Sequence, residues 1–204
     1  MKIFTGPMKS GKTKCLIKEI GRTPSRSRLV VCHKSSKVVS SRCSSTRDIV
    51  PDFCVELLSE VDVSDKQHIF IDECQLFPDL STFVQRYSDR KLYMAGLTRD
   101  YANQPFGHLD RFLQNAEVVR CIAICDYSCC VADAQYSKRI VDKHEQFISD
   151  KDIYEARCRE HYVPKIRYSD DGVDMTWEQI VTADVDQEIC LNTKYFTVIE
   201  NKIF

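Results

Sequence analysis

The stretch Gly6-Pro7-Met8-Lys9-Ser10-Gly11-Lys12-Thr13 fits the pattern G-x-x-x-x-G-K-[ST], between an apolar run at residues 3–4 and an amphipathic segment at 12–20. In such a loop the glycines let the backbone curl, so that its N–H groups and the following helix N-terminus face phosphate oxygens. The Lys12 ammonium reaches the β- and γ-phosphates, and the Thr13 hydroxyl ligates Mg²⁺. A chance glycine-rich turn is the alternative, which the strand, loop and helix context disfavours. The residues expected at the phosphates of ATP are Gly6, Lys9, Ser10, Gly11, Lys12 and Thr13.

Further apolar runs, separated by longer amphipathic segments, continue along the chain. They lie at residues 29–32, 69–71, 92–95 and 118–124. Helices are expected over 12–20, ending at Gly21, and over 78–90. Buried parallel strands joined by crossover helices give this pattern. The sequence therefore predicts an α/β fold of the P-loop (RecA-like) kind, in which helices cover both faces of a parallel sheet.

Length and composition limit the possible functions. A chain of 204 residues has room for one full core but not for two ordinary nucleotide-binding domains. A formal net charge of -1 gives no overall field to hold a polyanion, so no stable nucleic-acid binding is expected and a small phosphorylated ligand fits better. The chain starts without an apolar signal segment, and no run approaches the ~20 apolar residues of a membrane span. We therefore expect no membrane partner and a reducing, cytoplasmic setting, in which thiols can bind metal.

Two carboxylates end the apolar run at residues 68–71. Asp72 and Glu73 would lie at the C-terminal edge of a buried strand, where open α/β sheets bind their ligands. There Asp72 can hold Mg²⁺ together with Thr13, and Glu73 can act as the general base that takes a proton from an attacking hydroxyl or water. A strand ending in solvated acids is the alternative, which the phosphate loop disfavours.

Cysteine and histidine gather in two clusters after residue 124. Three thiols and one imidazole suit tetrahedral structural zinc. The candidate ligands are Cys125, Cys158, His161 and either Cys129 or Cys130. Packed thiols beside a surface histidine are the alternative. We expect a nucleotide-binding domain at 1–124, a zinc-binding domain at 125–163 and a C-terminal extension without a nameable motif at 164–204.

Five sequence blocks, in order from residue 6 to residue 161, resemble the type II, cellular-type thymidine kinases. The family's G-P-M-F-S-G-K-[ST] corresponds to residues 6–13, its D-E-G-Q-F-F-P-D to 72–79, and its A-[GA]-L-D-G-x-F-x-x-x-P-F to 95–106. Its A-x-[YF]-[ST]-K-R corresponds to 134–139, and its Y-x-x-x-C-R-x-[CH] to 154–161. Each block is moderately specific, but the ordered set is strong.

This resemblance implies an ATP- and Mg²⁺-dependent kinase that transfers the γ-phosphate of ATP to the 5′-hydroxyl of thymidine, with Glu73 as the base. A zinc ribbon would hold a lasso that closes over the nucleoside and reads its base through backbone groups. The family register favours Cys130 as the fourth zinc ligand, and members of the family tend to form tetramers. The implied substrate-binding residues are Met8, Tyr101, Glu145, Gln146, Phe147, Ile148, Ser149 and Tyr154. Core packing of Phe147 and Ile148, and a surface position for Tyr154, are the alternatives.

Some positions depart from the family pattern. Lys9 replaces an aromatic residue of the phosphate loop, Cys74 replaces a glycine, Leu76 replaces an aromatic residue, and Ser149-Asp150 replaces a pair of glycines. An enzyme with altered substrate preference, or a catalytically degenerate paralogue that binds zinc and nucleotide, would look like this. Residues 72–75 also resemble the D-E-C-H box of nucleic-acid-stimulated ATPases. Helicases of that type close ATP between two such domains, for which this chain has no room.

Overall fold

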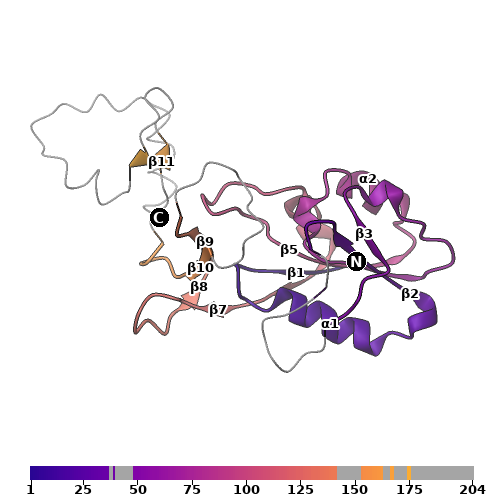
Figure 1. Ribbon diagram of the computed structural model, residues 1–204, viewed down its shortest axis with the longest axis horizontal. Coiled ribbons are helices and arrows are strands. Elements are labelled where there is room, and N and C mark those ends of the chain that lie inside the picture. Colours follow the sequence, from indigo (N-terminus) through magenta and orange to yellow (C-terminus); the bar gives the residue numbers. More distant parts are fainter. Residues whose placement is uncertain (37–38, 40–47, 142–152, 163–165, 168–173, 176–204) are drawn as a thin grey trace, which may run out of the picture. The chain divides into compact units, whose positions relative to one another are not determined.

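The computed structural model describes residues 1–36, 39, 48–141, 153–162, 166–167 and 174–175 (Figure 1). The chain divides into two compact units, Met1–Pro164 and Lys165–Phe204. In the second unit the described strands β11 (Ile166–Arg167) and β12 (Asp174–Met175) pair antiparallel. All elements below belong to the first unit. The domain boundaries expected after residues 124 and 163 stay predictions.

A six-stranded sheet forms the centre of the first unit, and each neighbouring pair of its strands is parallel. Parallel strands need crossover connections, which is why apolar runs and helical segments alternate in the sequence. The sheet confirms the predicted α/β fold. In spatial order its strands are β3 (Phe53–Val55), β2 (Arg28–His33), β4 (His68–Ile71), β5 (Lys91–Gly96), β1 (Lys2–Thr5) and β6 (Glu117–Arg120).

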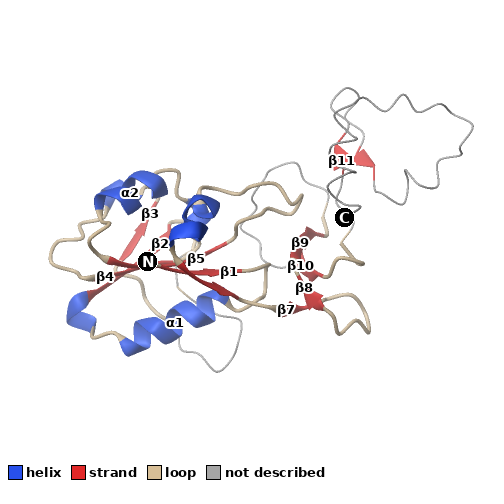
Figure 2. Cartoon of the chain, turned by 180° about the vertical axis from the view of Figure 1, so that it is seen from behind, coloured by secondary structure: helices blue, strands red, loops and turns tan. Residues whose placement is uncertain are grey.

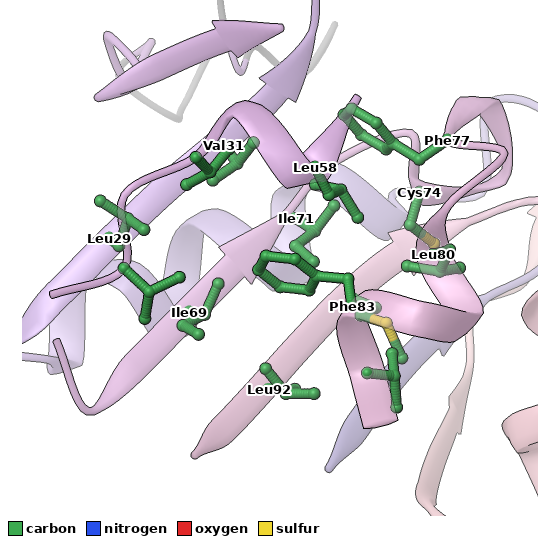
Figure 3. Packing of buried hydrophobic residues seen from close by; sticks show 14 of the residues in the cluster. Leu29, Val31, Leu58, Ile69, Ile71, Cys74, Phe77, Leu80, Phe83 and Leu92 are labelled. Carbon is green, nitrogen blue, oxygen red and sulfur yellow. The ribbon is translucent and has the colours of Figure 1, made fainter. Parts of the chain in front are cut away.

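Helices cover both faces of this sheet, with α1 (Lys12–Arg22) on one side and α2 (Leu80–Arg86) on the other (Figure 2). Successive side chains of a strand point to opposite faces, so each central strand contributes to two cores. The core under α1 includes Phe4, Leu16, Ile17, Ile20, Val30, Phe70 and Ala95. The core under α2, drawn in Figure 3, includes Leu29, Val31, Ile69, Ile71, Leu80, Phe83 and Leu92.

Both helices end at residues other than the predicted ones. α1 continues through Gly21 to Arg22. Gly21 does not adopt a positive φ, so it does not form the left-handed cap by which a glycine often ends a helix. The helix stops at Thr23, whose extended backbone (φ -104°, ψ 130°) is the conformation favoured before Pro24. α2 spans seven residues rather than the predicted 78–90. Asp79, at its start, accepts N–H groups from the turn η2, which anchors the helix there.

Short segments complete the description of the sheet region. The strand β3 was not predicted, since it has three residues and lies only partly buried at the edge of the sheet. The described 3₁₀ segments are η1 (Ser25–Ser27), η2 (Leu58–Glu60), η3 (Cys74–Leu76) and η4 (Leu109–Asn115). Among the residues that the structure describes, none of the helices has the length and apolarity to cross a membrane.

Two antiparallel strand pairs, which we call the ribbons, follow the sheet. β7 (Ala123–Ile124) pairs with β8 (Asp133–Ala134), and β9 (Tyr136–Arg139) pairs with β10 (Tyr154–Arg157) (Figure 1). Their buried apolar cluster consists of three alanines, Ala123, Ala134 and Ala156. A core of this size stabilises a fold weakly, so the ribbons need a further source of stability.

Candidate active site and metal centre

The predicted phosphate loop begins at the C-terminal end of β1, a strand that lies between β5 and β6 in the sheet. Its first glycine, Gly6, has φ 149°, and a Cβ built there would lie 2.2 Å from the Cys121 carbonyl oxygen, so no larger residue fits. Gly11 takes the left-handed conformation (φ 83°) as the N-cap of α1. These two glycines let the loop curl back over the start of the helix, as phosphate binding requires.

The side chains of the loop supply positive charge and a hydroxyl. The Lys12 ammonium is buried and donates to the Pro7 carbonyl at 2.7 Å. Burial lowers the pKa of Lys12, and the carboxylate of Glu73 is the main group that opposes this shift. The Ser10 hydroxyl is also buried and has no hydrogen-bond partner among the described residues. A phosphate oxygen would satisfy both groups, so the loop fits the triphosphate of ATP.

Thr13 and Asp72, the residues predicted at Mg²⁺, lie together although 59 positions separate them. The Thr13 hydroxyl donates to Asp72 Oδ1 at 3.1 Å and lies 3.4 Å from Oδ2. Asp72 is buried just beyond β4, and its N–H donates to the Val31 carbonyl at 3.1 Å. Because a hydroxyl and a carboxylate are hard oxygen ligands, the pair fits Mg²⁺ beside the phosphates.

Glu73 directly follows Asp72, beyond the C-terminal end of β4. Its backbone is left-handed (φ 51°, ψ 40°), which is uncommon for a residue with a Cβ. Its Oε2 accepts a hydrogen bond of 2.8 Å from Gln75 Nε2. The buried Gln75 in turn accepts the Leu97 N–H at 3.0 Å. Sequence reasoning assigned no role to Gln75, and the only available signal was the glutamine of the D-E-C-Q block.

The two aromatic residues predicted at the substrate, Tyr101 and Tyr154, are joined by Arg139. The Arg139 guanidinium lies 3.7 Å from the centre of the Tyr101 ring, and its Nη2 donates to the Tyr154 hydroxyl at 2.8 Å. Tyr154 is buried, contrary to the surface alternative. Sequence reasoning also missed Arg139, which belongs to the A-Q-Y-S-K-R block. The predicted lasso residues Glu145, Gln146, Phe147, Ile148 and Ser149 lie outside the described residues.

A cavity of about 420 Å³ adjoins the first residues of the phosphate loop. Its walls come from the end of β1, the segment after β5, the end of β6 and the start of β9, and they include Pro7, Leu97, Asp100, Tyr136 and Ser137. The volume is within the usual range of small-molecule sites. Met8, predicted at the substrate, donates its N–H to the Ser137 hydroxyl at 2.9 Å.

Four predicted metal ligands meet between the ribbons. The ligand atoms of Cys125, Cys130, Cys158 and His161 all lie within 4.8 Å of one another. His161 Nδ1 lies 3.6 Å from Cys125 Sγ and 3.2 Å from Cys158 Sγ, and Cys130 Sγ lies 4.0 Å from Cys158 Sγ. A tetrahedral zinc with Zn–S bonds of ~2.3 Å places its sulfurs about 3.8 Å apart. The donor set and its spacing therefore fit zinc.

The surroundings of these four residues also fit a metal. Burial by itself would raise the pKa of Cys125, but hydrogen bonds from the Cys158 and Tyr127 backbone and from His161 lower it to about 6, which favours the thiolate that binds metal. The Tyr127 ring stacks on His161, with centroids 4.0 Å apart. Cys129, the alternative fourth ligand, is exposed and its Sγ lies 3.7 Å from the Ser128 hydroxyl.

A phosphate loop, a Thr–Asp pair suited to Mg²⁺ and a carboxylate at the adjoining strand end define the class of P-loop proteins that bind a nucleoside triphosphate with Mg²⁺. Comparison with known proteins gives the family. Residues 1–162 match the family model described as thymidine kinase, and the chain belongs to the thymidine kinase family. The predicted resemblance is thereby confirmed, and the family is one of phosphotransferases that implies ATP, Mg²⁺ and a nucleoside substrate.

Individual relatives agree with this assignment. The chain is 32% identical to proteins named thymidine kinase from Mesomycoplasma hyopneumoniae (strain 7448) and from Yaba monkey tumor virus (strain VR587), each over 78% of this chain and 92% of the relative. The protein of that name from Rabbit fibroma virus (strain Kasza) is 28% identical over 78% of this chain and 94% of its own. The family does not favour the alternative of a nucleic-acid-stimulated ATPase.

Proposed function

We propose that this protein is an ATP-dependent thymidine kinase, which transfers the γ-phosphoryl group of ATP to the 5′-hydroxyl of thymidine. The observation that carries the proposal is the position of Glu73 beside Asp72, whose carboxylate accepts the hydrogen bond of Thr13 in the phosphate loop. A general base for the acceptor hydroxyl thus adjoins the groups that hold the donor phosphates. The names of the relatives support thymidine as the acceptor.

Each group has a separate task in this reaction. Lys12, Ser10 and the N–H groups of the loop bind the phosphates and stabilise the charge that develops during transfer. Thr13 and Asp72 hold Mg²⁺, which neutralises phosphate charge when bound. Glu73 accepts the proton of the 5′-hydroxyl, and Gln75 orients its carboxylate through the hydrogen bond at 2.8 Å.

We further propose which residues bind the nucleoside. Tyr101 packs on the base, and Tyr154 lies near the sugar, with Arg139 between the two rings. Residues 145–149 supply the backbone contacts of a lasso. Cys125, Cys130, Cys158 and His161 hold one structural zinc, which ties the start of the ribbons to the end of β10 and compensates for their small apolar core. The tetrameric state and the cytoplasmic location stay predictions.

A product screen tests the function. Purified protein would be incubated with γ-labelled ATP, Mg²⁺ and, in turn, thymidine, deoxyuridine, deoxycytidine and the purine deoxynucleosides. We expect label on the 5′-phosphate of thymidine, and loss of both ATP binding and product in a Lys12→Ala control. Release of free phosphate that nucleic acid stimulates would favour the ATPase alternative. Binding of ATP without any labelled product would favour the degenerate paralogue.

A further inference from the structure

Two contacts join the phosphate loop to the ribbons. The Met8 N–H donates to the Ser137 hydroxyl, and Lys9 Nζ lies 2.8 Å from Asp126 Oδ2. Lys9 replaces an aromatic residue of the family pattern, and an aromatic side chain at this position could not form the ion pair with Asp126. Both of its side chains keep about one third of their surface exposed, and solvent therefore screens the attraction in part.

Asp126 is held in place by the ribbon strands. Its N–H donates to the Ala156 carbonyl at 2.8 Å, and its Oδ2 accepts the Ala156 N–H at 2.7 Å. Asp126 directly follows Cys125, and the fully buried Ala156 precedes Cys158 by two positions. The carboxylate that contacts Lys9 is therefore held by two segments, one beginning at Cys125 and one ending at Cys158. Both of these cysteines are proposed zinc ligands.

The backbone of Lys9 gives this contact a consequence for nucleotide binding. Lys9 has φ 63°, in the left-handed region that is unfavourable for a residue with a Cβ. Such a conformation persists where surrounding contacts hold it. Lys9 directly precedes Ser10 and Gly11, two residues assigned to the phosphates. Any change in the Lys9 backbone would therefore redirect their N–H groups.

We propose that Lys9 is a positioning residue, whose ion pair with Asp126 holds the phosphate loop in its ATP-binding shape and links ATP affinity to the zinc ribbon. The inference rests on the ATP and zinc sites of the proposed function. Because the Lys9 ammonium is directed at the ribbon, the proposal leaves the backbone N–H of Lys9 as the group that contacts phosphate. Lys12 remains the cation of the triphosphate site.

The test is a double-mutant cycle on the equilibrium dissociation constant of ATP, with Lys9→Met, Asp126→Asn and the double variant. Asn at 126 removes the charge but keeps an oxygen that can accept the Ala156 N–H. We expect each single change to weaken ATP binding by about 3- to 10-fold, as for a partly exposed charge-assisted contact, and the double variant to bind no more weakly than the weaker single variant.

Several results would overturn the proposal. If the Lys9 ammonium contacted phosphate directly, Asp126→Asn would release it, and ATP binding would stay the same or become tighter. Additive losses in the double variant would show two independent effects. ATP binding is measured without a nucleoside, so these outcomes do not depend on the identity of the acceptor.

Controls separate the ion pair from general damage. Lys2→Met removes a partly buried pair with Glu19 and Glu117 at the other end of β1, and it should leave ATP affinity unchanged. Lys9→Arg should retain affinity, since the guanidinium can reach the same carboxylate. Elemental analysis of each variant reports whether the ribbon keeps its zinc. If Asp126→Asn loses the metal, the comparison of Lys9→Arg with Lys9→Met decides, and wild-type affinity in Lys9→Met overturns the proposal.

Discussion

The Glu73 carboxylate is oriented by a relay of hydrogen bonds through Gln75. Gln75 donates to Glu73 and accepts the Leu97 N–H, so it connects the end of β4 with the end of β5. Gly96 makes room for it, because a Cβ there would lie 2.5 Å from Gln75 Oε1. At the scale of single residues, the sequence was enough to propose Glu73 as the base, but the structure was needed to find the residue that its carboxylate contacts.

The first prediction concerns this acid. Replacing Glu73 with Gln preserves size and hydrogen bonding but removes the base. Turnover of thymidine should fall by roughly 10² to 10⁴, the usual contribution of a general base, while the dissociation constant of ATP stays within about 3-fold. Steady-state kinetics and equilibrium ATP binding on the same preparation would measure both quantities.

The matched control is Glu56→Gln, an exposed acid that pairs with Lys34 and has no assigned task. It should leave both turnover and ATP affinity unchanged. A Glu73→Gln variant that phosphorylates thymidine at nearly the wild-type rate would make Glu73 a solvated strand-end acid. The kinase would then need another base, although the ATP site would stand.

At the scale of elements, the apolar runs of the strands and the amphipathic pattern of the helices predicted which segments form the sheet and its covers. Helix ends were less accessible to prediction, because they depend on neighbours far along the chain. Asp79, for example, anchors the start of α2 by accepting two N–H groups from the turn around Leu58 and Ser59. The glycine expected to stop α1 lies within the helix, which ends at Arg22, just before Thr23.

A prediction at this scale concerns α2, which has seven residues and depends on its buried face. Phe83 is 4% exposed and packs in the core drawn in Figure 3. Phe83→Ala should lower the free energy of unfolding by about 3–5 kcal/mol, through lost apolar burial and the cavity left behind. Gln85→Ala, on the exposed side of the same helix, should change it by less than about 0.5 kcal/mol.

Urea unfolding followed by circular dichroism would give both free energies. Similar losses in the two variants would show that α2 is held by something other than its apolar face. The folded fraction of Phe83→Ala should still bind ATP, because Phe83 is not among the residues assigned to the phosphates.

At the scale of the whole molecule, the nucleotide-binding sheet and the ribbons form parts of one compact unit. The buried apolar cluster of the described ribbon residues consists of three alanines, so zinc should supply much of their stability, since metal binding contributes directly to folding. Met8 and Lys9 carry contacts from this region to the phosphate loop. A change at the metal centre should therefore be measurable at the ATP site.

Two cysteines of the metal region should differ in their effect on zinc binding. Elemental analysis of the wild type should find about one zinc per chain, and Cys158→Ser should lose most of it, because three ligands hold the ion far less tightly than four. The thermal midpoint of unfolding should fall with the metal. Cys129→Ser is the control, since Cys129 is exposed and lies outside the four-ligand cluster.

Less than half an equivalent of zinc in wild-type protein purified without chelators would refute the structural zinc. Zinc lost from Cys129→Ser but kept in Cys158→Ser would mean that the ligand set is wrong. Zinc lost from both variants would place the whole cysteine cluster, rather than the four residues, at the metal.

The sequence alone determined the local features of this protein. Loop glycines, the alternation of apolar runs and the order of short motifs are properties of neighbouring residues, so they predicted the parallel sheet, the phosphate loop and the family. The residues alone left Cys129 and Cys130 both open as the fourth ligand, and the family register favoured Cys130. Only the tertiary structure could decide features that require distant segments to meet: the contact of Thr13 with Asp72, the relay through Gln75, the grouping of Cys130 with Cys158 and His161, and the ion pair of Lys9 with Asp126. Side-chain contacts act over a few ångströms, and the fold alone sets which residues come that close.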